Sequence, residues 1–157
     1  MAVKCWSIYY AKNHVLIPTI VETFAGVNRL VDPMDVVDVN NQTELKHSIL
    51  ATIDKGNPLV PHPSREEMNE PITLHKKLGF KSYKAFNHNA LTWAIISIDG
   101  IYEIKFSQVP ESGRGYVPDP SKTITFPSGT PIETVVDKLI EIIQETHRQK
   151  MIEGNKE

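Results

Sequence analysis

Large hydrophobic side chains alternate with other residues near the start of the chain. In residues 5–11, CWSIYYA, the richer of the two alternating sets is Trp6, Ile8 and Tyr10. Aromatic and β-branched residues in this arrangement predict a strand inside a sheet. Residues 33–39, PMDVVDV, predict a second strand.

The clearest pattern lies in residues 90–107, ALTWAIISIDGIYEIKFS. Two apolar, β-rich runs meet at Asp99-Gly100, a pair that suits the positive φ angles of a tight turn. The sequence therefore predicts a central β-hairpin over about 90–107. A loop with two glycines and two prolines follows, and TITF at 123–126 predicts a short strand.

A capped apolar stripe predicts a helix after the second strand. Asn41 and Glu44 form a capping pair at its start, and Gly56 supplies its C-terminal stop. Four side chains fall on one helical face and are expected in the core: Leu45, Ile49, Leu50 and Ile53.

A second stripe predicts a long C-terminal helix at about 131–149. Thr130 is a suitable N-cap, Pro131 takes the first helical position and Glu133 completes the capping box. Its apolar stripe consists of Ile132, Val135, Val136, Leu139, Ile140, Ile142 and Ile143. We expect this helix to lie across the sheet and the polar tail 151–157 to fray.

The segment at 15–26, VLIPTIVETFAG, is ambiguous between helix and strand. Thr19 with Glu22 resembles a helix cap, whereas the density of β-branched residues favours an extended chain. We expect a short helix that ends at Gly26, with a strand as the alternative. Three prolines in residues 57–64, NPLVPHPS, predict a stiff loop.

Residues 65–79 are predicted to be helical, with a break or restart at Pro71. Ser64 and Glu67 form the capping pair, and Gly79 ends the segment. The apolar side chains available to the core are Ile72, Leu74 and Leu78.

Residues 79–90, GFKSYKAFNHNA, combine two lysines, three aromatic rings and a histidine. Phe80, Tyr83 and Phe86 recur at every third position, which favours a short helix capped by Ser82. This helix buries the rings and turns its lysines and His88 toward water. A nucleic-acid platform would instead expose the rings among the cations.

The order of these elements predicts an α+β fold with a mostly antiparallel sheet and helices packed on it, the C-terminal helix included. The length of 157 residues and the hydrophobic fraction of 40% favour a single domain over 1–150. A net charge of −2 gives no global attraction to nucleic acid or anionic membranes.

The single cysteine, Cys5, excludes an intramolecular disulfide and fits a reducing compartment. The first residues lack a clear signal peptide, and no apolar run is long enough to span a membrane. We therefore expect a cytoplasmic protein that is neither exported nor anchored.

No recognised catalytic or metal-binding motif is present in the sequence. The histidines occur at 14, 47, 62, 75, 88 and 147, without the spacing of a zinc site, and phosphate-binding and nucleophile-elbow motifs are absent. Cys5 lies in a predicted interior strand, so we expect a core cysteine rather than a nucleophile. The sequence predicts neither a metal nor a cofactor.

The residues are compatible with two functional classes, a small enzyme and a nucleic-acid-binding domain. A small enzyme would bring His88, Arg114 and Tyr116 into one anion-binding pocket. A nucleic-acid-binding domain, which the low charge disfavours, would need one continuous basic surface made of Lys76, Lys77, Lys81, Lys84 and Arg114.

Residues 78–143 resemble small bacterial immunity proteins of contact-dependent growth inhibition systems. The resemblance rests on LGFKSYKAF, a strand that carries Trp93, YEIKF, GRGYVPDP and TITFPSGTPIE before the final helix. It implies a non-enzymatic protein that binds and neutralises a cognate toxin domain, often a nuclease. No motif of that family marks a residue for binding.

Acidic residues are the candidates for contact with such a partner, because clustered carboxylates steer association with a basic protein. They lie in and beside the strand at 33–39 and in the first turns of the helix after Ser64. The candidate partner-binding residues are Asp35, Asp38, Glu66, Glu67 and Glu70.

Overall fold

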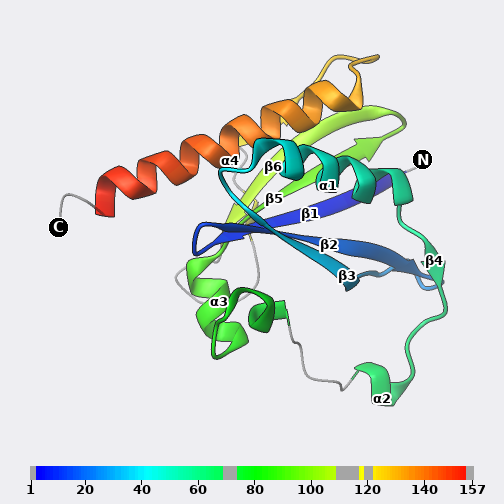
Figure 1. Ribbon diagram of the computed structural model, residues 1–157. Coiled ribbons are helices and arrows are strands. Elements are labelled where there is room, and N and C mark those ends of the chain that lie inside the picture. Colours follow the sequence, from blue (N-terminus) through cyan, green and yellow to red (C-terminus); the bar gives the residue numbers. More distant parts are fainter. Residues whose placement is uncertain (1–2, 69–73, 109–116, 119–121, 155–157) are drawn as a thin grey trace.

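Figure 1 shows the fold in a computed structural model that describes residues 3–68, 74–108, 117–118 and 122–154. Within these residues, eight strands form one sheet with the main order β3-β2-β1-β5-β6-β7. The strands of this path are β1 (Val3–Ala11), β2 (His14–Thr23), β3 (Asn28–Asp38), β5 (Leu91–Ile98), β6 (Ile101–Gln108) and β7 (Val117–Pro118). Beside it, β4 (Leu59–Val60) pairs in parallel with β2, and β8 (Ile124–Thr125) pairs in antiparallel with β6.

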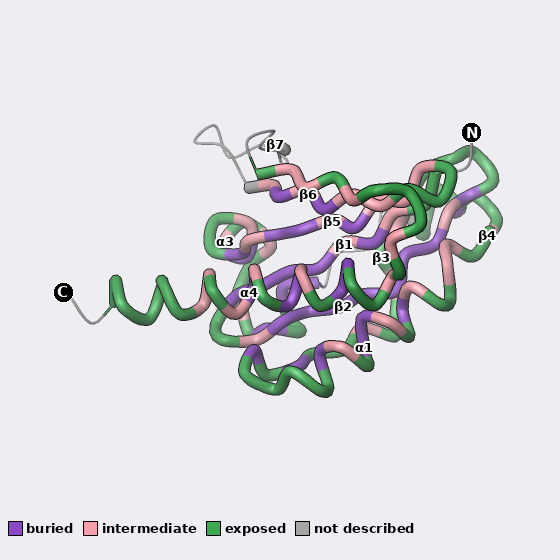
Figure 2. Tube along the Cα trace, turned by 90° about the horizontal axis from the view of Figure 1, so that it is seen from above, coloured by how far each residue is buried: buried purple, intermediate pink, exposed green. Residues whose placement is uncertain are grey.

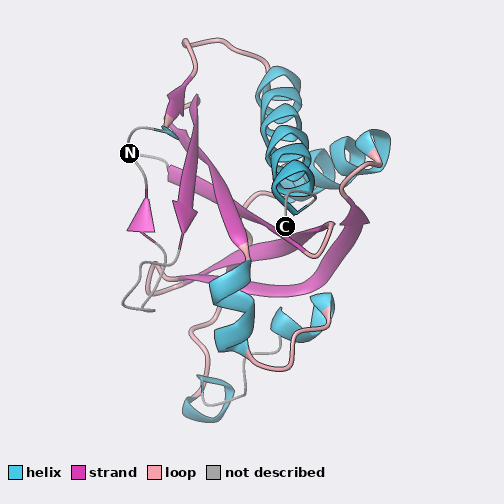
Figure 3. Ribbon diagram, turned by 90° about the vertical axis from the view of Figure 1, so that its left-hand side faces the viewer, coloured by secondary structure: helices cyan, strands magenta, loops and turns pink. Residues whose placement is uncertain are grey.

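Helices cover both faces of this sheet. The helices α1 (Gln42–Lys55) and α4 (Ile132–Gly154) lie on one face, and α3 (Tyr83–Asn89) lies on the other (Figures 1 and 3). The 3-10 helix η1 (Leu74–Leu78) packs beside α3, and α2 (Arg65–Met68) lies at the end of the molecule away from α1 and α4. The predicted α+β fold, with its mostly antiparallel sheet and long C-terminal helix, is confirmed.

The strand β1 contributes to two hydrophobic clusters, one on each face of the sheet. Its predicted richer set, Trp6, Ile8 and Tyr10, packs in the larger cluster with buried side chains of α1 and α4. Tyr9 and Ala11 pack in the smaller cluster with η1 and α3. The alternation in CWSIYYA therefore predicted the strand correctly, and both of its faces are covered.

The prediction of a short helix at 15–26 is wrong, because these residues form most of β2. Eight of the ten residues of β2 are buried, so a strand covered on both faces appears in the sequence as a continuous apolar run. The hydroxyl of Thr19, which suggested a helix cap, instead donates to the carbonyl of Pro33 at 2.8 Å. β2 ends at Thr23 rather than at Gly26, which lies in the following turn with φ +83°.

The other local predictions around β3 and α1 are confirmed. The strand expected at 33–39 is the second half of β3, which begins at Asn28. The side chain of Asn41 accepts from the amide of Glu44 at 3.1 Å and donates to its carboxylate at 2.9 Å. Gly56 ends α1 with φ +69°.

The central hairpin is confirmed as β5 and β6. Asp99 and Gly100 have φ angles of +50° and +84°, and the pairing of Ile98 with Ile101 closes the turn. Positive φ at both turn positions matches the right-handed twist of the two strands. The short strand predicted at 123–126 is confirmed as β8.

The helix α4 is longer than predicted, because it continues through residues 151–154, where a frayed tail was expected. The hydroxyl of Tyr10 and Nδ1 of His147 form a hydrogen bond of 2.7 Å, and Lys150 lies over the Tyr10 ring. These contacts hold the far half of α4 to β1, while its last turns stay exposed (Figure 2). Residues 155–157 lie outside the described part of the chain.

The predicted helical segment 65–79 is only partly confirmed. It contains the four-residue α2, whose Glu67 amide donates to Ser64 Oγ at 3.2 Å, and the five-residue η1, which ends before Gly79. Leu74 and Leu78 are buried as expected, whereas Pro71 and Ile72 lie outside the described residues.

The helix expected within residues 79–90 is confirmed as α3. Ser82 Oγ accepts from the Ala85 amide at 3.0 Å, and Phe86 is fully buried against the rings of Phe80 and Tyr83. The lysines of the segment and His88 are exposed, as predicted. The aromatic residues of this stretch therefore anchor α3 to the sheet.

The segment 57–64, predicted as a stiff loop, also contains the short strand β4, and the side-chain amide of its first residue, Asn57, bonds the backbone of two other strands. The Asn57 side chain accepts from the Cys5 amide at 2.9 Å and donates to the carbonyls of Cys5 and Ile20 at 2.9 and 3.2 Å. The residues of β1 that pair with β2 are Tyr9–Ala11, and the Asn57 side chain supplies hydrogen bonds to the backbone where the two strands separate.

None of the helices in the described ranges has both the length and the apolar character needed to cross a membrane.

Substitution of Asn57 by Ala should lower the free energy of unfolding by about 2–3 kcal/mol, because partly buried backbone groups of Cys5 and Ile20 lose their partner. Urea denaturation measures this difference. Asn89→Ala is the matched control, since it removes one exposed hydrogen bond to Ala85. Equal destabilisation by the two substitutions would contradict the bridging role.

Candidate protein-binding surface

The two acidic candidates on β3 are exposed, but each carboxylate also serves the fold. Asp35 accepts a short hydrogen bond from the hydroxyl of Ser48, a buried residue of α1. Asp38 accepts from the amide of Asn40 at 2.8 Å and so stabilises the turn into α1. Each carboxylate therefore has fewer free acceptor positions to offer to a partner.

The candidates on α2 are in a different situation. Glu66 and Glu67 are exposed, and neither side chain takes part in an ion pair within the described residues. The short helix has its start fixed by Ser64. Two uncompensated carboxylates therefore extend into solvent at this end of the molecule. Glu70 lies outside the described residues, so its position stays a prediction.

A further acidic set lies along the outer face of α4 and was missed at the sequence level. Its members follow one another at every fourth position: Glu133, Asp137, Glu141 and Glu145. The four-residue spacing of these carboxylates in the sequence predicts the row. Like charges at this spacing repel one another by roughly 0.2–0.5 kcal/mol per pair.

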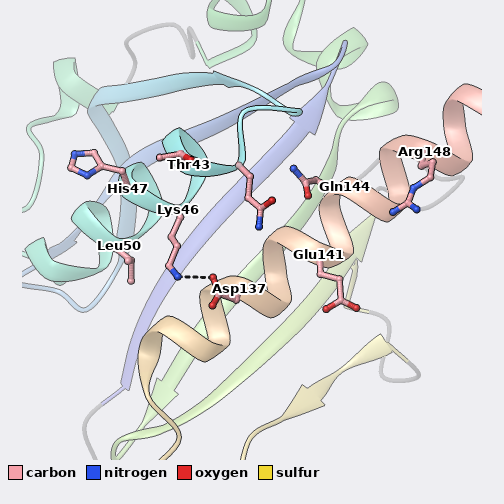
Figure 4. Close-up of a pocket in the computed structure, with 9 residues that line it drawn as sticks. Thr43, Lys46, His47, Leu50, Asp137, Glu141, Gln144 and Arg148 are labelled. Atoms are coloured by element: carbon pink, nitrogen blue, oxygen red, sulfur yellow. Dashed lines mark ion pairs between the residues drawn. The ribbon is translucent and has the colours of Figure 1, made fainter.

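Three of these four carboxylates are compensated by nearby cations. Asp137 pairs with Lys46 of α1 at 2.9 Å, Glu141 with Lys138 at 3.3 Å and Glu145 with Arg148 at 2.7 Å. The first pair spans a polar groove of about 820 Å³ between α1 and α4 (Figure 4). The ion pairs reduce the negative potential of α4.

A second groove, of about 1070 Å³, lies under the far half of α4. Its walls are hydrophobic residues of the hairpin and of α4, such as Phe106 and Ile142, and its rim carries charges of both signs. Lys122 lies over the Phe106 ring at 4.6 Å. Neither groove contains any of the predicted partner-binding residues.

The proposed enzyme constellation is only partly described. His88 is exposed in the last turn of α3, whereas Arg114 and Tyr116 lie outside the described residues. Their convergence stays a prediction. Within the described ranges no group of three or more His, Cys, Asp and Glu side chains is placed to hold a metal ion. Two histidines have structural surroundings: His147 bonds Tyr10, and His75 is buried in η1.

Cys5 lies in β1 at an intermediate degree of burial. Loss of hydration raises the pKa of its thiol, and the positive charge of Lys105 opposes part of that rise. A raised pKa keeps the thiol protonated, which is the opposite of what a nucleophile requires. The expected core position of Cys5 is not confirmed, because the residue is only half-buried and lies outside both hydrophobic clusters.

Comparison with known proteins identifies relatives by fold only. No family model and no curated sequence matches the chain. A protein of unknown function, NMB0488 from Neisseria meningitidis, aligns over 93% of this chain and 95% of its own with a TM-score of 0.64 and 13% identity. A chain of the CdiA-CT/CdiI toxin and immunity complex from Yersinia pseudotuberculosis aligns over 92% of this chain and 98% of its own, with a TM-score of 0.59 and 11% identity. At such identities the likeness shows a shared fold.

The raised pKa of Cys5 predicts a loss of stability at alkaline pH. A folded-state pKa above the unfolded value contributes stability that is complete below about pH 9 and is lost as the pH rises through the folded-state pKa. Urea denaturation between about pH 8 and pH 11 should therefore show a smaller fall in unfolding free energy for Cys5→Ala than for the unaltered chain.

Ser7→Ala is the control for this measurement, since Ser7 is also partly buried on β1 but does not titrate. It should retain the pH dependence of the unaltered chain. Identical slopes for all three proteins would show that the Cys5 thiol is not linked to stability.

Proposed function

We propose that this chain is a non-enzymatic binding protein that neutralises a cognate toxin domain, as an immunity protein of a bacterial contact-dependent growth inhibition system. The observation that carries the proposal is the fold match, over 92% of the chain, to a chain of a toxin and immunity complex. The resemblance of residues 78–143 to such immunity proteins agrees with it.

The charge distribution supports a partner with a basic surface, such as a nuclease with a basic nucleic-acid cleft. Glu66 and Glu67 lie on α2 without ion-pair partners among the described residues. Exposed charges of one sign accelerate the encounter with a protein of opposite charge, and the effect weakens with salt. We assign the main acidic contact to α2, with Glu70 beside it in the sequence. Asp35 and Asp38 of β3 remain further candidates for contact with the partner.

The proposal predicts that a neighbouring gene encodes the toxin domain, and that domain is used for the test. Co-expression should restore growth of cells that the domain alone inhibits, and calorimetry should show a one-to-one complex of the purified proteins. A domain that stays toxic and does not bind overturns the proposal. Turnover of a substrate by the isolated chain would favour the enzyme alternative.

Charge reversal of α2 in the double variant Glu66→Lys, Glu67→Lys should weaken toxin binding about tenfold or more at low salt, because it replaces attraction by repulsion. Stopped-flow association at several salt concentrations measures the effect. The matched control reverses Glu133 and Glu141 on α4, which changes the net charge equally on the other side of the molecule. Equal losses in both variants would indicate a general charge effect rather than contact through α2.

A further inference from the structure

The segment that forms η1 and α3 is strongly basic in a chain that is slightly acidic overall. Residues 74–90 contain four lysines and no aspartate or glutamate. All four, Lys76, Lys77, Lys81 and Lys84, are exposed. We call this surface the basic lobe. The net charge of the chain is −2, so all residues other than these four lysines together carry a charge of −6.

The basic lobe has a rigid foundation. Phe86 is fully buried, and its ring packs on Phe80 and Tyr83 with centroids 5.7 and 6.1 Å away. Lys12, from the β1–β2 turn, donates to the Gly79 carbonyl at 3.2 Å and lies over the Phe80 ring at 4.1 Å. The aromatic rings therefore hold the lobe on the sheet and bring a fifth positive charge to it.

The basic lobe adjoins acidic parts of the molecule. Lys77 of η1 forms an ion pair of 3.0 Å with Asp32 of β3. Two perpendicular views place α2 and α3 toward the same end of the molecule, away from α1 and α4 (Figures 1 and 3). A partner seated at this end would therefore face surfaces of both signs.

We infer that the basic lobe is a second contact region for the protein partner and binds an acidic patch on that partner. The inference rests on the proposed function and adds the charge that this part of the partner must carry. Opposite charges on neighbouring parts of an interface favour one orientation of docking, because a rotated partner places like charges together.

An acidic protein surface fits the basic lobe better than nucleic acid does. A duplex-binding protein can make about 6–10 phosphate contacts, whereas the lobe together with Lys12 offers five positive charges, and Lys77 already has a carboxylate partner. Single strands need exposed rings, but here the rings pack inward. An extended polyanion would also meet the negative remainder of the chain, whereas a compact acidic patch would not.

The test measures binding of the toxin domain from the neighbouring gene to the double variant Lys81→Glu, Lys84→Glu. We expect the dissociation constant to rise about tenfold or more at low salt, with a smaller difference at high salt. The control, Lys4→Glu with Lys55→Glu, makes the same charge change at two exposed lysines outside the lobe and should bind nearly as the unaltered chain does. Thermal unfolding verifies that both variants fold.

The outcomes separate this inference from the proposed function. If the unaltered chain does not bind the toxin domain, the proposed function fails, and the second contact region fails with it. If the unaltered chain binds and the lobe variant binds equally well, only the second contact region is overturned. If the unaltered chain shifts a short DNA duplex in a gel at low salt and the lobe variant does not, the basic lobe binds nucleic acid, and the inference of an acidic protein patch is overturned.

Discussion

The structure depends on the burial of β1 on both faces. One face of this strand packs with α1 and α4 and the other with η1 and α3, so that elements from both ends of the chain meet on it. β5 pairs along most of its length on one side. On the other side, β2 pairs at the end and Asn57 bridges the gap where the strands separate. A polar side chain completes the sheet beside the hydrophobic core, since unpaired backbone groups there would be costly.

This arrangement also separates the charges of the surface. The helices α1 and α4 occupy one face, where ion pairs such as Lys46 with Asp137 compensate most carboxylates of α4. The elements α2, η1 and α3 lie at the opposite end, with exposed lysines on η1 and α3 and with glutamates on α2 that have no ion-pair partner in the described part of the chain. Charges without intramolecular partners have the largest influence on association, so the proposed binding surface lies at this end.

Local interactions explain why many elements were predictable. The capping pairs of Asn41 with Glu44 and of Ser82 with Ala85, and the Asp99-Gly100 turn, each involve residues within four positions of one another. The error at β2 has the opposite origin, because its two buried faces removed the alternation that indicates a strand. The contact that holds the far half of α4 to β1 joins Tyr10 and His147, which are 137 positions apart.

The sequence by itself determined the α+β class, the central hairpin, the capped helices and the acidic or basic character of each segment, because these follow from side-chain chemistry and short-range spacing. The tertiary structure decided which carboxylates stay available. Asp35 is engaged by Ser48 of α1, whereas Glu66 and Glu67 take part in no ion pair within the described residues. It also brought Lys77 of η1 next to Asp32 of β3. Such pairings join residues distant in the chain, and only the packing of helices on the sheet brings them within reach.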